Sequence, residues 1–219
     1  MALADIPNFD SAIRALRDLF GKAEVEKRFA RLEEIFGESE RCWQNNLKLF
    51  KESTVRYVLL AEAPPWRDKG QEISYFYRNF EQGRARFLRW AVWKCFFKEK
   101  PLDYDNGLAM LAEQGFLLID ALPFAMKYVS KKRKDPAYKE LLKASEAFMT
   151  AKLSDASIKW DKGVKLALAF NLFGQAAVSA FGTITLPRGQ RITLDKTLFA
   201  ADEAGYTNAT KLRRIFLNR

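Results

Sequence analysis

Histidine is absent from this chain of 219 residues. Its absence excludes Ser–His–Asp and Cys–His catalysis, zinc sites with histidine ligands, and a histidine general base. Any chemistry must therefore come from carboxylates, lysine, tyrosine, hydroxyl groups or the backbone.

Cysteine is almost as scarce, with Cys42 and Cys95 as the two thiols. Two thiols cannot complete a four-cysteine zinc or iron–sulfur site. Hydrophobic residues make up 48% of the chain, which is enough for a core without disulfide bonds. We therefore expect reduced thiols, no metal and no cofactor in a cytoplasmic protein.

Long apolar runs are missing as well. The most apolar stretch, 164–181, is interrupted by Lys165, Asn171 and Gln175, so it cannot be a lipid-spanning helix. The N-terminus has no basic segment followed by a long apolar one, so we expect neither a signal peptide nor membrane binding. The sequence also has no P-loop and no Gly-x-Gly-x-x-Gly after an expected strand, which disfavours nucleotide hydrolysis and dinucleotide redox chemistry.

Positive charge is what the chain has in excess. Lysine and arginine number 37 against 27 acidic residues, a net charge of +10, which makes nucleic acid the leading partner. The densest basic run, Lys131-Lys132-Arg133-Lys134, follows an expected strand closely. Such a run is either a solvated loop or a segment that contacts phosphates at the edge of a sheet.

The periodicity of apolar residues predicts an α/β protein. In the first fifty residues we expect one helix that ends at Gly21, a second that ends at Gly37 and a third that holds Cys42 to Phe50. Beyond them, the expected strands are 55–61, 116–120, 165–170 and 197–200, with a hairpin over 184–194. The expected helices are 81–97, a segment from 103 or 105 to about 114, 136–152, 171–181, and one capped by Thr207 or Asn208.

Alternating strands and helices favour a parallel sheet that is covered on both faces. We expect a three-layer αβα fold with a short central parallel sheet and a helical N-terminal segment. The whole chain, 1–219, is expected to be one domain, with a helical layer over 1–53 and an α/β core over 54–219.

Three polar segments follow expected strands: 61–65, 120–123 and 201–208. Any single acid there is more often a helix cap or a surface residue. Three such segments at the carboxyl edge of one sheet favour a functional site that contains Glu62 and Asp120.

The sequence Val58-Leu-Leu-Ala-Glu-Ala-Pro-Pro65, followed by Tyr75-Phe76-Tyr77, resembles the first motif of the uracil-DNA glycosylase superfamily. One branch of that superfamily has Gly-Glu-Ala-Pro-Gly after its first strand. By order of elements, the resemblance covers roughly residues 55 to 215.

The chain departs from the family pattern in four ways. Ala61 replaces a glycine, Asp120 replaces the base-reading asparagine, and 200–212 lacks the His-Pro-Ser of better-known branches. The four cysteines of iron–sulfur members are also missing.

The resemblance implies a monofunctional, monomeric DNA N-glycosylase that flips a base out of double-stranded DNA, with no protein partner. It implies that Glu62 stabilises positive charge on the sugar or orients a water, with Asp120 as the second catalytic residue. The base-binding residues would be Ala63, Pro64, Phe76, Tyr77, Asp120, Tyr206 and Asn208, with Phe76 or Tyr77 either stacking on the base or lying in the core. The DNA-binding residues would be Arg84, Lys131, Lys132, Arg133, Lys134, Lys211, Arg213 and Arg214.

Asp120 gives the sharpest expectation. Asparagine both donates and accepts, whereas an ionised aspartate only accepts and so suits the exocyclic amine of cytosine better than the O4 atom of uracil. We therefore expect a modified cytosine as the substrate, such as hydroxymethylcytosine or its glucosylated form in phage DNA, and a role in antiviral defence.

Three alternatives stay open at this point. The chain may keep the fold as a non-catalytic nucleic-acid-binding protein, or it may act as an N-glycosidase on free nucleosides or nucleotides. It may also be an unrelated α/β protein in which Glu-Ala-Pro occurs by chance.

Overall fold

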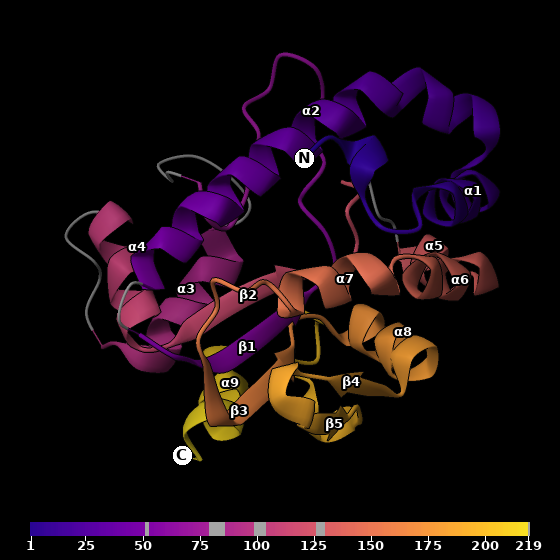
Figure 1. Ribbon diagram of the computed structural model, residues 1–219. Helices are drawn as coiled ribbons and strands as arrows, with labels where there is room; N and C mark the ends of the chain where they lie inside the picture. Colours follow the sequence, from indigo (N-terminus) through magenta and orange to yellow (C-terminus); the bar gives the residue numbers. More distant parts are fainter. Residues whose placement is uncertain (51–52, 79–85, 99–103, 126–129, 219) are drawn as a thin grey trace.

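A three-stranded parallel sheet forms the centre of the molecule, in the order β2-β1-β3 (Figure 1). The computed structural model describes residues 1–50, 53–78, 86–98, 104–125 and 130–218. The strands are β1 (Val55–Ala61), β2 (Phe116–Asp120) and β3 (Trp160–Leu168), with an antiparallel pair β4 (Thr183–Thr185) and β5 (Arg191–Thr193). The helices are α1 (Phe9–Phe20), α2 (Lys22–Leu47), α3 (Arg86–Phe96), α4 (Tyr104–Glu113), α5 (Ser130–Arg133), α6 (Pro136–Ala144), α7 (Glu146–Leu153), α8 (Asn171–Phe181) and α9 (Ala209–Leu217), with short 3-10 turns at Leu3–Asp5, Lys48–Phe50, Pro187–Gly189 and Lys196–Leu198. The expected α/β fold class with a short parallel sheet is confirmed.

The two strands that matter most, β1 and β2, are short apolar runs. All of β2 is buried, and so is β1 from Val58 to Ala61, as is typical of strands covered on both faces. The register pairs Ala61 with Asp120, so both strands end at the same level of the sheet. Two further backbone hydrogen bonds, Leu122 N–H to the Glu62 carbonyl among them, extend the pairing beyond the strand ends. Glu62 and Asp120 are therefore fixed on adjacent chains at one edge.

One face of the sheet is covered by aromatic packing against α3 and α9. The ring of Tyr57 in β1 lies 5.3 Å from that of Phe96 in α3 and 5.2 Å from that of Phe216 in α9. Phe116 of β2 joins the same cluster, at 5.8 Å from Phe96. This cluster joins both helices to the two strands that carry the site.

Helices α7 and α8 contact β2 and β3, while α6 packs between α8 and α1. The N-terminal helices α1 and α2 lie at the top of Figure 1, and α2 runs along the molecule towards α3 and α4. With α3 and α9 on the other side, the arrangement is the three-layer αβα architecture that we expected. Among the described residues, no helix has the length and apolar character needed to cross a membrane.

The expectation that a helix ends at Gly37 is wrong. Helix α2 continues through Gly37 to Leu47 because Val25, Leu32, Phe36 and Trp43 form one buried stripe along it. A glycine ends a helix when it takes positive φ, and Gly37 does not. Packing of the stripe offsets the cost of about 1 kcal/mol for a glycine inside a helix.

Three other boundaries also differ from the expectations. The helix expected over 136–152 divides at Ser145, whose buried N–H is bonded to the Leu141 and Leu142 carbonyls. The strand expected over 165–170 begins earlier, at Trp160. The strand expected over 197–200 is a 3-10 turn that Asp195 caps, followed by a single parallel bridge between Phe199 and Leu168.

The ends of the other elements follow local signals. Helix α1 ends at Gly21, with φ of 90°, and the hairpin turns at Pro187–Gly189 as expected. Helix α9 begins after Asn208, whose side-chain oxygen accepts hydrogen bonds from the N–H groups of Thr210 and Lys211. The first residues of the helix expected from Glu81 lie outside the described residues, and α3 is described from Arg86.

Candidate functional site at the carboxyl edge of the sheet

Glu62 is the first residue after β1, and its side chain is buried, with 4% of its surface exposed. Arg133 of α5 binds both carboxylate oxygens, with Nε 2.8 Å from Oε1 and Nη2 2.6 Å from Oε2. The hydroxyl of Tyr138 in α6 donates to Oε1 at 2.5 Å. A buried carboxylate is retained only when it is paired and hydrogen-bonded, and these contacts meet that need.

Asp120, the last residue of β2, has no such partner. It is 3% exposed, and its Oδ2 atom makes no hydrogen bond to any described residue. The Tyr75 hydroxyl is also buried without a hydrogen bond of ordinary geometry, although it lies near enough to Asp120 to favour the ionised carboxylate. A buried carboxylate without a partner is rare in proteins and is typical of a functional position.

The charges around Asp120 determine how it ionises. Burial raises the pKa of its carboxyl from 3.8 to about 7, and Lys152 and Tyr75 oppose that rise. The carboxylates of Glu40 and Glu62 add to it. Asp120 therefore exists near neutral pH as a mixture of the protonated acid and the carboxylate, which differs from the fully ionised group that we expected from the sequence.

A buried ion pair that we did not expect lies next to Asp120. Lys152 of α7 is 5% exposed, and its ammonium pairs with Glu40 of α2. The same ammonium lies 4.4 Å from the ring centre of Trp43 and 5.0 Å from that of Phe148. The available signal in the sequence is that Glu40 interrupts the apolar stripe of α2, four residues after Phe36 and three before Trp43.

Arg133 occupies a different place from the one we expected. We assigned it to DNA phosphates, but its guanidinium is engaged by Glu62 in the interior edge of the site. Tyr138 escaped the sequence reasoning altogether, because a tyrosine in an amphipathic helix is usually a core residue. Its placement follows from Pro136, which starts α6, and from Asp135, which caps it.

The two rings proposed to stack on a base lie in the core. Phe76 is 3% exposed and packs against Phe116 at 5.8 Å and Tyr77 at 5.0 Å. The Tyr77 hydroxyl donates to the Leu118 carbonyl of β2 at 3.0 Å. Neither ring presents a free face in this conformation, so the core alternative holds for both. Of the neighbouring residues, Pro64 is buried and Ala63 half-buried.

The 201–208 loop lies at the carboxyl end of β3, as expected. Thr207 donates its hydroxyl to the Ala169 carbonyl at 2.5 Å, and the Gly205 carbonyl accepts from the Asn171 N–H at 3.4 Å. Tyr206 is 65% exposed. Asn208 uses its side-chain oxygen to cap α9, so its amide has a structural function first.

The remaining basic residues divide into two groups. Lys131 and Lys134, on either side of Arg133, are exposed. Lys132 donates to the Leu19 carbonyl at the end of α1, and Arg213 donates to the carbonyls of Lys94 and Cys95 in α3. Lys211 is half-buried, Arg214 is exposed, and Arg84 lies outside the described residues. The described cations nearest to the site that are open to solvent are thus Lys131 and Lys134.

No family model, no curated protein and no solved structure matches this chain. The resemblance to the uracil-DNA glycosylase superfamily therefore carries only the weight of its own residues. Across the described part of the chain, no three acidic or cysteine side chains are grouped as metal ligands.

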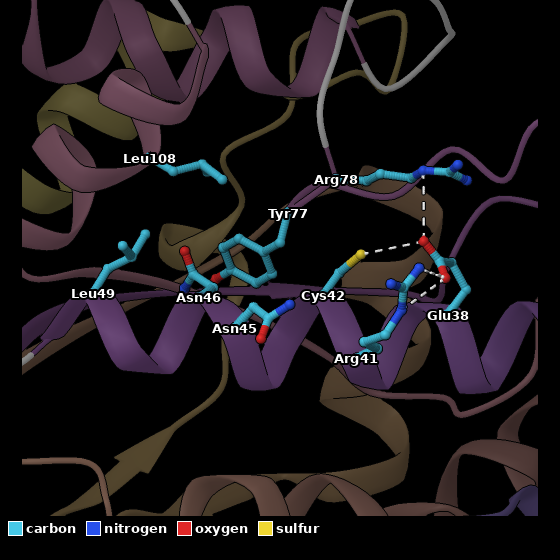
Figure 2. Close-up of a pocket in the computed structure, with 9 residues that line it drawn as sticks. All are labelled: Glu38, Arg41, Cys42, Asn45, Asn46, Leu49, Tyr77, Arg78 and Leu108. Carbon is cyan, nitrogen blue, oxygen red and sulfur yellow. Dashed lines mark hydrogen bonds and ion pairs between the residues drawn. The ribbon is translucent and has the colours of Figure 1, made fainter.

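A second hollow lies along α2, away from both carboxylates of the sheet edge. Figure 2 shows its polar side, where Glu38 accepts the Cys42 thiol at 3.7 Å and pairs with Arg41 and Arg78. Burial, first among the causes, raises the pKa of the Cys42 thiol to about 11, and likewise that of Cys95 to about 12. Both thiols are therefore protonated at neutral pH and are poor nucleophiles.

Proposed function

We propose that this protein is a DNA N-glycosylase that removes a modified base, with a modified cytosine as the preferred substrate. The observation that carries the proposal is the placement of Glu62 and Asp120 side by side, buried, at the carboxyl ends of adjacent parallel strands. Ligands of open α/β sheets bind at that edge. The resemblance of the Glu62 motif to the superfamily agrees with this reading.

Glu62 supplies the negative charge that bond cleavage requires. As the N-glycosidic bond breaks, its electron pair leaves with the base and positive charge develops on the sugar, as in other glycoside cleavages. Water then adds to the sugar carbon, its proton passes to the departing base, and an abasic site with a new hydroxyl remains. The carboxylate of Glu62 stabilises the cation and orients the water, and Tyr138 holds the orientation of its Oε1 atom through the 2.5 Å hydrogen bond.

Asp120 reads the base. Its Oδ2 atom is an unused acceptor in a buried position, so a flipped base with an exocyclic amine would satisfy it. Glutamate and aspartate accept from the N4 amine of cytosine in DNA recognition generally. An orphaned buried acceptor thus favours a cytosine-type base over uracil.

Lys131 and Lys134 are the exposed cations that suit the backbone phosphates beside this edge. Flipping a base costs a few kcal/mol, which phosphate contacts help to offset. The net charge of +10 adds a general attraction to DNA.

The proposal is tested with four duplexes that carry uracil, cytosine, hydroxymethylcytosine or glucosylated hydroxymethylcytosine at one position. Each is incubated with the protein and then cleaved with alkali at abasic sites. We expect strand cleavage with a modified-cytosine duplex. Release from the uracil duplex alone would contradict the assignment of Asp120.

A non-catalytic DNA-binding protein on the same fold is the second candidate. It is favoured by one observation, the engagement of both Glu62 oxygens by Arg133 and Tyr138, which leaves the carboxylate little freedom to contact a substrate. Salt-sensitive DNA binding without abasic product from any of the four duplexes would support this candidate over the first.

A further inference from the structure

Four ionisable side chains surround the carboxyl of Asp120. They are Lys152 of α7, Glu40 of α2, and Tyr75 and Glu62 from the segment that follows β1. The hydroxyl of Tyr75 stays protonated, because burial and then the charge of Asp120 raise its pKa. Lys152 is therefore the one cation among the described groups that act on Asp120.

The position of Lys152 is unusual for a lysine. Its ammonium is almost completely removed from solvent, pairs with Glu40 and faces the rings of Trp43 and Phe148. A buried ion pair is weak support for stability, since apolar residues of similar volume serve as well or better. A buried pair beside an unpartnered carboxylate calls for a function other than stability.

We propose that Lys152 is a specificity-determining residue, whose buried ammonium holds Asp120 in the ionised form that accepts from an amino-bearing base. This inference rests on the proposed function. In the ionised form Asp120 only accepts and repels the O4 atom of uracil, whereas the protonated form carries a donor and resembles asparagine. Lys152 acts through Asp120 and does not touch the base.

Two consequences follow for the choice of base. Because the Asp120 carboxyl has a pKa of about 7, the preference for cytosine-type over uracil-type bases should rise with pH across neutrality. Removal of the ammonium should favour the protonated acid and move the preference towards uracil at the same pH. The effect of Lys152 on Asp120 exceeds that of Glu40, so removal of both together has the same direction.

The test uses the double variant Lys152→Met with Glu40→Gln, which removes both charges and leaves neither buried alone. The matched control is Lys143→Met with Glu140→Gln, which removes an exposed pair on α6 with an N–O distance of 2.9 Å. Single-turnover release from uracil and modified-cytosine duplexes is measured between pH 6 and 8.5. We expect the cytosine-to-uracil rate ratio at pH 7 to fall about tenfold in the double variant and to stay unchanged in the control.

Asp120→Asn supplies the second variant, since an amide donates and accepts at every pH. We expect it to prefer uracil and to lose the pH dependence of the ratio. The ¹³C signal of the Asp120 carboxyl in the free protein gives a readout that needs no activity, and its titration midpoint should move to higher pH in the double variant only.

The outcomes separate the inference from the proposed function. Base release with an unchanged ratio, or an unchanged carboxyl titration in the double variant, overturns the role of Lys152 and leaves the glycosylase proposal intact. Absence of release from every duplex by the unaltered protein overturns the proposed function, and with it the specificity role, whatever the titration shows.

Discussion

Glu62 and Asp120 are neighbours that differ in how their charge is balanced. Glu62 has a guanidinium on both oxygens and a tyrosine hydroxyl on one, whereas Asp120 has an empty acceptor and a nearby ammonium. Burial acts on both carboxyls, but their partners give them different work. Pairs of titratable groups with such different environments are typical of sites that divide stabilisation of charge from recognition.

The Glu62–Arg133 pair should be a strong contributor to stability. Arg133→Met leaves the buried carboxylate with the Tyr138 hydroxyl as its remaining printed donor, so we expect a loss of about 2–3 kcal/mol in urea unfolding. Lys143→Met breaks an exposed pair and should cost less than about 0.5 kcal/mol. Equal effects of the two substitutions would contradict the account of Glu62.

The stability of the protein should record the ionisation of Asp120. Its pKa in the folded state, about 7, lies above its ordinary value of 3.8, so between these values the folded protein holds a proton that the unfolded chain has lost. This group therefore makes stability fall as pH rises from about 4 to 7, after which its effect is constant.

Asp120→Asn removes that term. Relative to the unaltered protein, the variant should gain stability as pH rises, by up to roughly 4 kcal/mol at pH 8, since each unit of pKa shift is worth about 1.4 kcal/mol. Urea unfolding at pH 4.5, 6 and 8 measures the difference, with Asp18→Asn on the exposed side of α1 as the control. A difference that does not change with pH would mean that Asp120 is not ionised at a shifted pKa.

At the scale of elements, the turn between α4 and β2 decides where Asp120 lies. Gly115 has φ of 77°, and a Cβ atom there would strike the Thr54 carbonyl just before β1. The backbone of β1 and that of the turn therefore approach closely at the amino edge, which sets the register that pairs Ala61 with Asp120 at the other edge.

Gly115→Ala should be much more harmful than Gly70→Ala. Both positions have positive φ, 77° and 81°, but Gly70 has open space around its Cβ position. We expect about 1 kcal/mol for Gly70→Ala from the backbone alone, and at least 2 kcal/mol for Gly115→Ala from the backbone and the clash. Thermal unfolding of both variants makes the comparison, and similar losses would show that the close approach does not matter.

The elements that sequence reasoning located well are those governed by local signals. The apolar runs of β1 and β2, the glycine after α1 and the Asn208 cap of α9 act within a few residues of their own position. The continuation of α2 through Gly37 depends instead on a stripe of tertiary contacts, which no local signal reveals.

The site itself was predictable only in part. The position of Glu62 and Asp120 follows from strand ends, since parallel strands place their carboxyl ends together. The contacts of Arg133, Tyr138 and Lys152 join residues that are 71, 76 and 112 positions apart in the chain from their carboxylate partners. Distances of that length along the sequence are set by the packing of whole layers, and the same packing places Phe76 in the core.

At the scale of the whole molecule, charge should govern the affinity for DNA. Lys131 and Lys134 lie next to the site on α5 and just after it, whereas Lys162 lies near the beginning of β3, at the opposite edge of the sheet. If DNA binds at the carboxyl edge, the first two lysines make phosphate contacts and the last does not.

This difference predicts how binding responds to salt. Lys131→Gln with Lys134→Gln should lower the slope of log K against log salt by about 1–2, because each phosphate contact contributes about 0.9 to that slope. Lys162→Gln with Lys196→Gln should leave the slope unchanged. Fluorescence anisotropy with a labelled duplex between 50 and 300 mM salt measures both, and a fall of equal size in the two variants would place the DNA elsewhere.

The central claim is that Glu62, at the end of β1, cleaves a glycosidic bond in DNA. Single-turnover release of the base from a modified-cytosine duplex tests it most directly, with the unaltered protein compared with Glu62→Gln and with Glu113→Gln, an exposed residue of α4. We predict that Glu62→Gln slows release by about 100-fold or more, while Glu113→Gln releases base at the rate of the unaltered protein. An undiminished rate in Glu62→Gln would contradict the claim.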